Sequence, residues 1–341
     1  MLLVPSIFVA STTLSFDANF RTNIAFVLSG PICLGMASLF CYGKRITPKE
    51  ITSVLLYMVL PIIALTAYIY LYNPSIKDVL SNTMSNREAS GGWGPNQVAT
   101  ALGLGIIILT MRVFLNSPTL LLKIVNSILL ALMGYRAIVT FSRGGVFAAI
   151  ITIAVFLFIF FLSSNYKQKS KIILMSLLLA FVLAGTWVIS SQQTRGYIDL
   201  RYANKDHLGR EKGDLTTGRK ELFLKELEGF MQQPFLGIGS SRAKDQRIEI
   251  EGQGVTSHSE VSRTLAEHGI LGIVVLLILI FKPLELTKYN SINYFFYAFL
   301  CFWFLTVNHS SMRIAAPAFV YALALLNVRY EKPPVHRERL V

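Results

Sequence analysis

The stretch GVFAAIITIAVFLFIFFLS (residues 145–163) decides the fold, because it carries no charged residue. An apolar run of about 20 residues is long enough to cross the roughly 30 Å hydrocarbon core of a bilayer as a helix. The rest of the chain is similar: 53% of its 341 residues are hydrophobic and only 15% are charged, against about a quarter in soluble domains. The sequence therefore predicts a polytopic membrane protein.

Several similar stretches predict a bundle of transmembrane helices. Helices satisfy their own backbone hydrogen bonds in lipid, and the alternating apolar pattern of a membrane β-barrel does not appear in the sequence. The predicted fold class is therefore all-α, with about ten spans. The expected spans are residues 1–16, 22–42, 51–72, 96–116, 119–140, 145–163, 171–190, 263–282, 291–308 and 312–328.

These spans divide the chain into four parts. Residues 1–190 hold seven transmembrane helices, 191–262 form a long polar loop, 263–328 hold three more helices, and 329–341 form a tail. Within the loop, TTGRKELFLKELEGFMQQPFLGIGSS (216–241) predicts a helix with one apolar face, ended by proline and glycine. This helix fits equally well on the membrane surface or packed over the mouth of the bundle.

Basic residues gather in the loops that alternation places on one side of the bundle. The positive-inside rule makes that side cytoplasmic, which puts both termini in the cytoplasm and the loop 191–262 on the opposite side. The net charge of +13 is therefore interpreted as an orientation signal, and no nucleic-acid partner is expected. The basic residues on this side are Lys44, Arg45, Lys49, Lys167, Lys169, Lys171, Lys282, Lys288, Arg329, Lys332, Arg337 and Arg339.

The candidate functional residues are basic and lie on the expected outer side. Guanidinium groups bind phosphate oxygens bidentately, and a neutral histidine can abstract a proton near pH 7. All 19 acidic residues lie in loops or near span ends, whereas ion-coupled transporters often need acids within a span. The pattern favours acyl or glycosyl transfer from a phosphate-bearing lipid. The candidates are Arg87, Arg136, Arg143, Arg219, His258, His309 and Arg313.

Each candidate also fits an ordinary structural role. The arginines fit as interfacial or solvated side chains, His258 fits as a group that satisfies the backbone at the start of a span, and His309 with Arg313 fits as an interfacial anchor. No two histidines are three or four residues apart and no CxxC occurs, so neither a metal site nor a disulfide is expected.

Four stretches, in this order, resemble the O-antigen ligase and polymerase superfamily of integral membrane glycosyltransferases. The first is Arg87 followed by GWGPNQVA (92–99), and the second is FSRGG (141–145) between two spans. The third is TGRKELFLKELEGFMQQPFLGIGSS (217–241), with its Gly-Arg, helix and Pro-x-x-Gly-x-Gly. The fourth is SHSEVSRTLAEHGILG (257–272), which enters a span. The likeness covers about residues 85–285.

This resemblance implies a multi-pass enzyme of the bacterial inner membrane that works at the periplasmic face. The donor would be a glycan on undecaprenyl diphosphate, and the acceptor a sugar hydroxyl of another glycan or of lipid A-core. Arg143 and Arg219 would hold the diphosphate, His258 would activate the acceptor, and Arg87 would help to shape the donor site. The anomeric centre would invert without a metal ion or cofactor.

The residues leave several alternatives open. A repeat-unit polymerase, a polysaccharide ligase and a protein-glycosylating enzyme share this chemistry. A lipid-linked glycan flippase or another transporter would use the outer arginines to bind cargo, and His258 would then have no chemical role. A non-catalytic scaffold among polysaccharide-export partners would need neither His258 nor Arg219.

Overall fold

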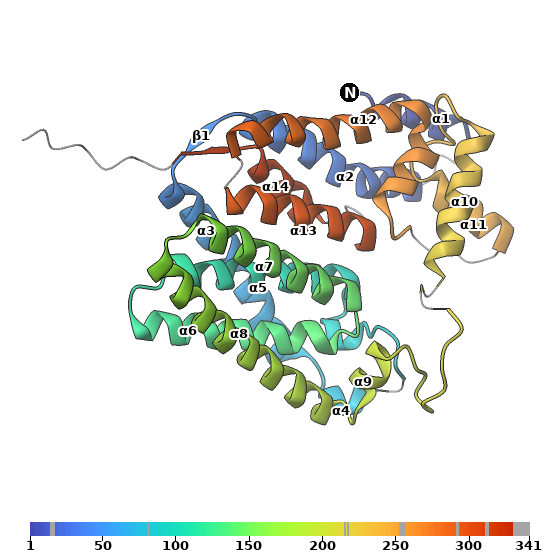
Figure 1. Cartoon of the computed structure of the whole chain (residues 1–341). Coiled ribbons are helices and arrows are strands. Elements are labelled where there is room, and N and C mark those ends of the chain that lie inside the picture. Colours follow the sequence, from blue (N-terminus) through green and yellow to red (C-terminus); the bar gives the residue numbers. More distant parts are fainter. Residues whose placement is uncertain are drawn as a thin grey trace, which may run out of the picture.

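The computed structural model describes residues 1–13, 18–80, 82–214, 216, 218–251, 257–290, 293–310 and 314–329. Nearly all regular structure in this part of the chain is helical (Figure 1), which confirms the predicted fold class. The strands β1 (Arg45–Ile46) and β2 (Asn327–Val328) form one short parallel pair. This pair ties the connection after the second predicted span to the end of the last one.

Seven helices in the described residues are long and apolar enough to cross a membrane. This finding confirms a membrane protein, whereas the predicted number of ten spans is not confirmed. The seven are α2 (Ala18–Cys41), α3 (Pro48–Tyr72), α5 (Pro95–Leu115), α6 (Leu120–Val139), α7 (Arg143–Ser163), α8 (Tyr166–Gln193) and α12 (Glu260–Asn290).

Three shorter helices occupy the other predicted spans. They are α1 (Pro5–Thr13), α13 (Tyr294–Ser310) and α14 (Ala315–Ala324). The nine residues of α1 extend only about 14 Å at 1.5 Å per residue, about half of the hydrocarbon core. By length alone, this helix does not establish a separate span.

The helices pack in two groups, visible as the upper and lower halves of Figure 1. The upper group contains α2, α12, α13 and α14, and the lower group contains α3 and α5 to α8. Helix α7 packs against both α5 and α13 and so joins the two groups. Most of α5 is buried, whereas α8 is largely exposed, so α5 is the central helix of the bundle and α8 lies at its periphery.

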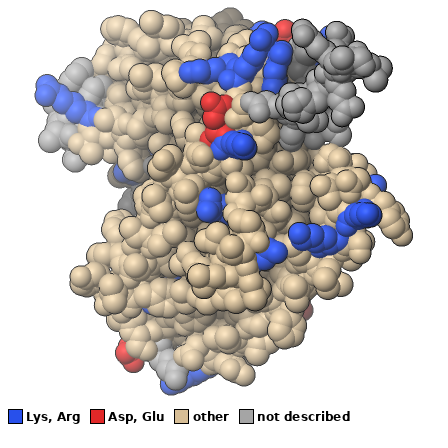
Figure 2. Space-filling model, turned by 90° about the vertical axis from the view of Figure 1, so that its left-hand side faces the viewer, with Lys and Arg blue, Asp and Glu red and all other residues tan. Residues whose placement is uncertain are grey.

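One end of the bundle carries the strand pair and the basic connections. Lys44 lies over the ring of Phe40, and Lys282 of α12 lies over the ring of Tyr42, so basic side chains of the connection after α2 and of α12 lie at this end. Figure 2 views this end and shows more Lys and Arg side chains than acidic ones. The cytoplasmic assignment of this end stays a prediction.

The opposite end carries the short helices of the polar segments. Before α5 lie α4 (Ile76–Val79) and the 3₁₀ helix η1 (Glu88–Ser90). The long loop folds into α9 (Tyr197–Tyr202), α10 (Arg219–Gln232) and α11 (Arg242–Glu251). The predicted loop helix is therefore α10, and it packs on α12, which agrees with packing over the bundle mouth.

Candidate functional site

The turn between α6 and α7 presents Ser142 and Arg143. Phe141 is fully buried and has a left-handed backbone with φ of 59°, so the chain reverses direction there. The backbone nitrogen of Ser142 donates a hydrogen bond to Oγ1 of Thr140 at 3.2 Å. Arg143 is then the first residue of α7, and its side chain starts at the end of the bundle that carries the polar segments.

Two glycines after Arg143 let three helices meet. A Cβ on Gly144 would lie 2.1 Å from Nδ1 of His309 in α13. A Cβ on Gly145 would lie 2.6 Å from Cβ of Ala99 in α5. Both distances are too short for a Cβ atom. The two glycines of the FSRGG motif are therefore needed for the close packing of α7 on α5 and α13.

A chain of hydrogen bonds joins α5, α7, α13 and the segment before α12. Nδ2 of Asn96 lies 3.4 Å from Nδ1 of His258. Oδ1 of Asn96 accepts a hydrogen bond from Oγ of Ser142 at 2.8 Å. The same Oγ lies 3.1 Å from Nε2 of His309. The structure thus brings together two predicted site residues, His258 and His309, through two polar side chains.

Three arginines form a positive cluster beside this network. Nη1 of Arg143 donates to the backbone oxygen of Arg201 at 3.4 Å, and Nε of Arg201 donates to the backbone oxygen of Phe141 at 3.1 Å. Burial, followed by the charges of Arg143 and Arg219, lowers the pKa of Arg201 to about 10. Burial and the charge of Arg143 also lower the pKa of Arg219. Three guanidinium groups therefore share one region, and each of them repels the others.

The start of α10 is built by a turn around Asp214. Its carboxylate accepts hydrogen bonds from the backbone nitrogen and the hydroxyl of Thr216, at 2.7 and 2.6 Å, and from the backbone nitrogen of Gly218. These bonds, that of the Thr216 hydroxyl first, lower the pKa of Asp214. Gly218 has φ of +80°, a conformation that glycine adopts without strain. The ordered turn fixes the position of Arg219.

The Pro-x-x-Gly-x-Gly motif after α10 docks on a break in α12. The backbone nitrogen of Ile270 donates to the backbone oxygen of Pro234 at 2.8 Å. Gly269 leaves the helical conformation with φ of 57° and ψ of −137°. A Cβ on Gly237 would lie 2.4 Å from the backbone of Glu267. The motif therefore holds α10, and with it Arg219, against the helix that begins just after His258.

The contacts seen for the other predicted residues lie elsewhere. Arg87 is exposed, and its Nε donates to the backbone oxygen of Gly92 at 2.8 Å. Arg136 is buried, donates to the backbone oxygen of Ile69 at 3.1 Å and lies 4.2 Å from the ring centre of Tyr70. These contacts join Arg136 to α3. Arg313 lies outside the described residues.

The sequence interpretation missed three members of the site. Asn96 and Ser142 lie inside quoted motifs, but a motif does not tell which polar side chain makes the contact. Arg201 lies in YIDLRY (197–202), where nothing distinguishes it from the other charged residues of the loop. Its 8% exposure is the sign that it belongs to the site, and exposure is known only from the fold.

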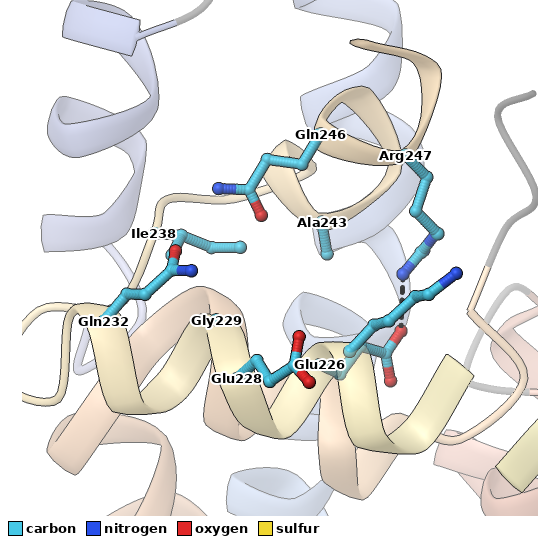
Figure 3. Close-up of a pocket in the computed structure, with 9 residues that line it drawn as sticks. Glu226, Glu228, Gly229, Gln232, Ile238, Ala243, Gln246 and Arg247 are labelled. Carbon is cyan, nitrogen blue, oxygen red and sulfur yellow. Dashed lines mark hydrogen bonds and ion pairs between the residues drawn. The ribbon is translucent and has the colours of Figure 1, made fainter. Parts of the chain in front are cut away.

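Two cavities lie near the site. An apolar cavity of about 430 Å³ is bordered by residues of α1, α2, α12 and α13, including Glu260 and Val307, each two residues from a histidine of the network. A polar pocket of about 190 Å³ lies between α10 and α11. Figure 3 shows Gln232, Gln246 and Glu228 around it and the bond between Arg247 and Glu226 at its edge.

In the described residues, no group of three His, Cys, Asp or Glu could hold a metal ion.

Comparison with known proteins gives the same family as the motifs. Residues 128–277 match the family model of the O-antigen ligase, a range that contains three of the four quoted stretches. No curated protein matches the chain significantly. The match and the apolar helices indicate a multi-pass inner-membrane protein of polysaccharide biosynthesis. The predicted resemblance is thus confirmed: the O-antigen ligase domain matched at residues 128–277 supports the O-antigen ligase superfamily.

Proposed function

We propose that the protein transfers a glycan from undecaprenyl diphosphate to a sugar hydroxyl at the periplasmic face of the inner membrane. The observation that carries this proposal is the cluster of Arg143, Arg201 and Arg219, in which burial and the neighbouring guanidinium charges lower the pKa of Arg201 and of Arg219. An anion bound among them would relieve this repulsion. A diphosphate offers the oxygen atoms that guanidinium groups bind best.

In the proposed reaction, His258 acts opposite the arginines. Its Nε2 takes the proton of the acceptor hydroxyl, and the freed oxygen forms a bond to the anomeric carbon. The bond from that carbon to the diphosphate oxygen breaks, its electron pair leaves with the diphosphate, and the anomeric centre inverts. Arg143 and Arg219 stabilise the negative charge that grows on the leaving group. This role needs neither a metal ion nor a nucleotide.

The apolar cavity supports a lipid-linked substrate. Its lining includes apolar residues of α12 on both sides of the break at Gly269, together with residues of α2 and α13. The cavity also reaches Glu260 and Val307, beside the network of His258 and His309. A polyprenyl chain lying in it would bring its diphosphate to the arginines. Arg87, on the same predicted face, would contact the glycan part of the donor.

The test is the surface polysaccharide of cells that carry His258→Ala or Arg219→Ala, with membrane expression checked by blot. We expect loss of long or attached glycan while the lipid-linked donor accumulates. His207→Ala is the matched control, because His207 is exposed in the same loop, and it should leave the glycan unchanged. Free polymer would indicate a ligase, and single repeat units on lipid A-core would indicate a polymerase. Wild-type glycan from His258→Ala would contradict the proposal and favour a transporter or a scaffold.

A further inference from the structure

Asn96 stands between His258 and the rest of the network. Its Nδ2 faces Nδ1 of His258 at 3.4 Å, and its Oδ1 accepts the hydrogen bond of Ser142 at 2.8 Å. We propose that Asn96 is a positioning residue that orients His258 and selects which ring nitrogen carries the proton. The catalytic meaning of this inference rests on the proposed function, whereas the tautomer of His258 is measurable without a substrate.

The support of Asn96 is rigid. Asn96 is the second residue of α5, after Pro95, whose fixed φ suits the first position of a helix. Three residues further on, Ala99 contacts the backbone of α7 so closely that Gly145 cannot carry a side chain. The start of α5 therefore holds its place against α7, and the amide of Asn96 moves by rotation about its own side-chain torsions.

The far end of the network is equally fixed. The ring of His309 lies against Gly144, and the side chain is 4% exposed. Nδ1 of His309 is buried and makes no hydrogen bond to the described residues. His309 therefore reaches the network through Nε2, which lies 3.1 Å from Oγ of Ser142.

The direction of one hydrogen bond sets the direction of the others. Ser142 donates its proton to Oδ1 of Asn96, so it accepts from Nε2–H of His309. Nδ2 of Asn96 donates to Nδ1 of His258, and a neutral His258 then carries its own proton on Nε2. In this arrangement Nε2 is a hydrogen-bond donor and cannot take a proton.

A half turn of the Asn96 amide reverses the network. The amide oxygen and nitrogen exchange nearly equivalent positions, so Oδ1 now accepts from Nδ1–H of His258. Nε2 of His258 is then free of its proton and acts as a base. The reversed network turns His309 into its Nδ1–H form, whose N–H has no acceptor in the described residues. The resting protein therefore holds the first arrangement, and rotation of the amide creates the base.

The test measures the tautomer of His258 directly. The full chain carries five histidines, so nitrogen-15-labelled histidine in lipid nanodiscs gives a simple NMR spectrum, and His258→Gln assigns the signal. We expect the Nε2–H tautomer in the wild type. Asn96→Asp replaces the amide by a carboxylate that only accepts, so His258 should change to Nδ1–H and titrate about one pH unit higher. Arg143, Arg219 and His309 are unchanged between the wild type and Asn96→Asp, so a difference in the titration of His258 reports the new carboxylate.

Asn126 provides the matched control. It is also buried, and its Nδ2 donates to Oγ of Ser117 at 2.9 Å, at the end of α6 away from the site. Asn126→Asp should leave the His258 signal unchanged. If Asn96→Asp also leaves the tautomer and the titration of His258 unchanged, the proposed role of Asn96 is wrong.

A second experiment measures the rate of glycan transfer in membrane vesicles. The vesicles contain the lipid-linked donor made by the cells from which they are prepared. Asn96→Leu should lower kcat about tenfold or more, with little change in KM, because the base is misplaced. Asn96→Asp should retain kcat at high pH, and the fall of its rate on the acid side should begin at a higher pH than in the wild type. If the NMR result holds while His258→Ala transfers glycan normally, the proposed function fails and the positioning role of Asn96 stands.

Discussion

The ring of His309 lies so close to Gly144 that a methyl group on this glycine would come within 2.1 Å of Nδ1. We expect Gly144→Ala to displace the ring and to break its contact with Ser142. Overpacking of this kind costs about 1–3 kcal/mol of stability, and the hydrogen-bond network should lose its fixed end. Thermal unfolding of the purified protein and the surface glycan of the cells measure both effects.

Gly185→Ala is the control for this substitution. Gly185 lies inside α8, and a Cβ there meets nothing within 4 Å. Alanine favours the helix interior by up to about 1 kcal/mol over glycine, so this variant should be as stable as the wild type or more stable. Equal unfolding temperatures and equal glycan for both variants would show that the ring of His309 is not held as described.

A multiply charged anion should stabilise the protein through the arginine cluster. Sulfate or inorganic pyrophosphate that binds only the folded state adds about 2.7 kcal/mol at a concentration of 100 Kd. Arg219→Gln should remove most of this stabilisation. Arg210→Gln should retain it, because Arg210 is exposed and bonds Asp206 at 2.8 Å. Equal anion-induced shifts in the unfolding temperature of both variants would rule out the cluster as the binding site.

The same experiment has a pH dependence that follows from Arg201. The pKa of its guanidinium is lowered to about 10, so the group keeps its proton in the neutral range and loses it as the pH rises through that value. Stabilisation by sulfate should therefore be constant from about pH 6 to 9 and should weaken above it. A steady decline from pH 6 upward would point to a histidine instead.

Sequence patterns predicted the helices of this fold well, because spans are long apolar runs whose character is local. Arg143, Arg136, Arg219, His258 and His309 were all selected because charges beside apolar spans stand out. The structure places the guanidinium of Arg136 over Tyr70, and a seven-residue spacing does not reveal this partner from α3. Arg201 and Asn96 acquire their roles from contacts with residues about 50 to 160 positions away, which no local pattern encodes.

Glu226 couples α10 to its neighbours, and its loss should loosen the segment that presents Arg219. Its carboxylate accepts hydrogen bonds from Oγ of Ser262 at 2.5 Å and from Nη1 of Arg247 at 3.3 Å. Both side chains of the ion pair are at most 5% exposed. Removing one partner of a buried pair costs about 3–5 kcal/mol, so Glu226→Ala should be strongly destabilised and its loop should be cleaved faster by protease.

Two comparisons make this prediction specific. The double variant Glu226→Leu with Arg247→Met should recover much of the lost stability, because no buried charge is left unpaired. Glu285→Ala removes a partner of Lys282 in an exposed pair at 2.9 Å, and such pairs contribute only about 0–1 kcal/mol. If Glu285→Ala and Glu226→Ala lower the unfolding temperature equally, the buried pair does not hold α10 in place.

Gly35 lines the apolar cavity, and a Cβ built on it meets nothing within 4 Å. The backbone therefore accepts a side chain at this position, and Gly35→Phe should fill part of the cavity and leave the unfolding temperature near that of the wild type. If the cavity holds the lipid chain of the donor, this variant should raise KM for the lipid-linked glycan severalfold. Gly185→Phe places the same ring in open space on α8, away from the cavity lining, and controls for the added apolar surface. Wild-type KM in Gly35→Phe, together with wild-type expression, would exclude this cavity as the binding site of the lipid chain and leave the role of the arginines untouched.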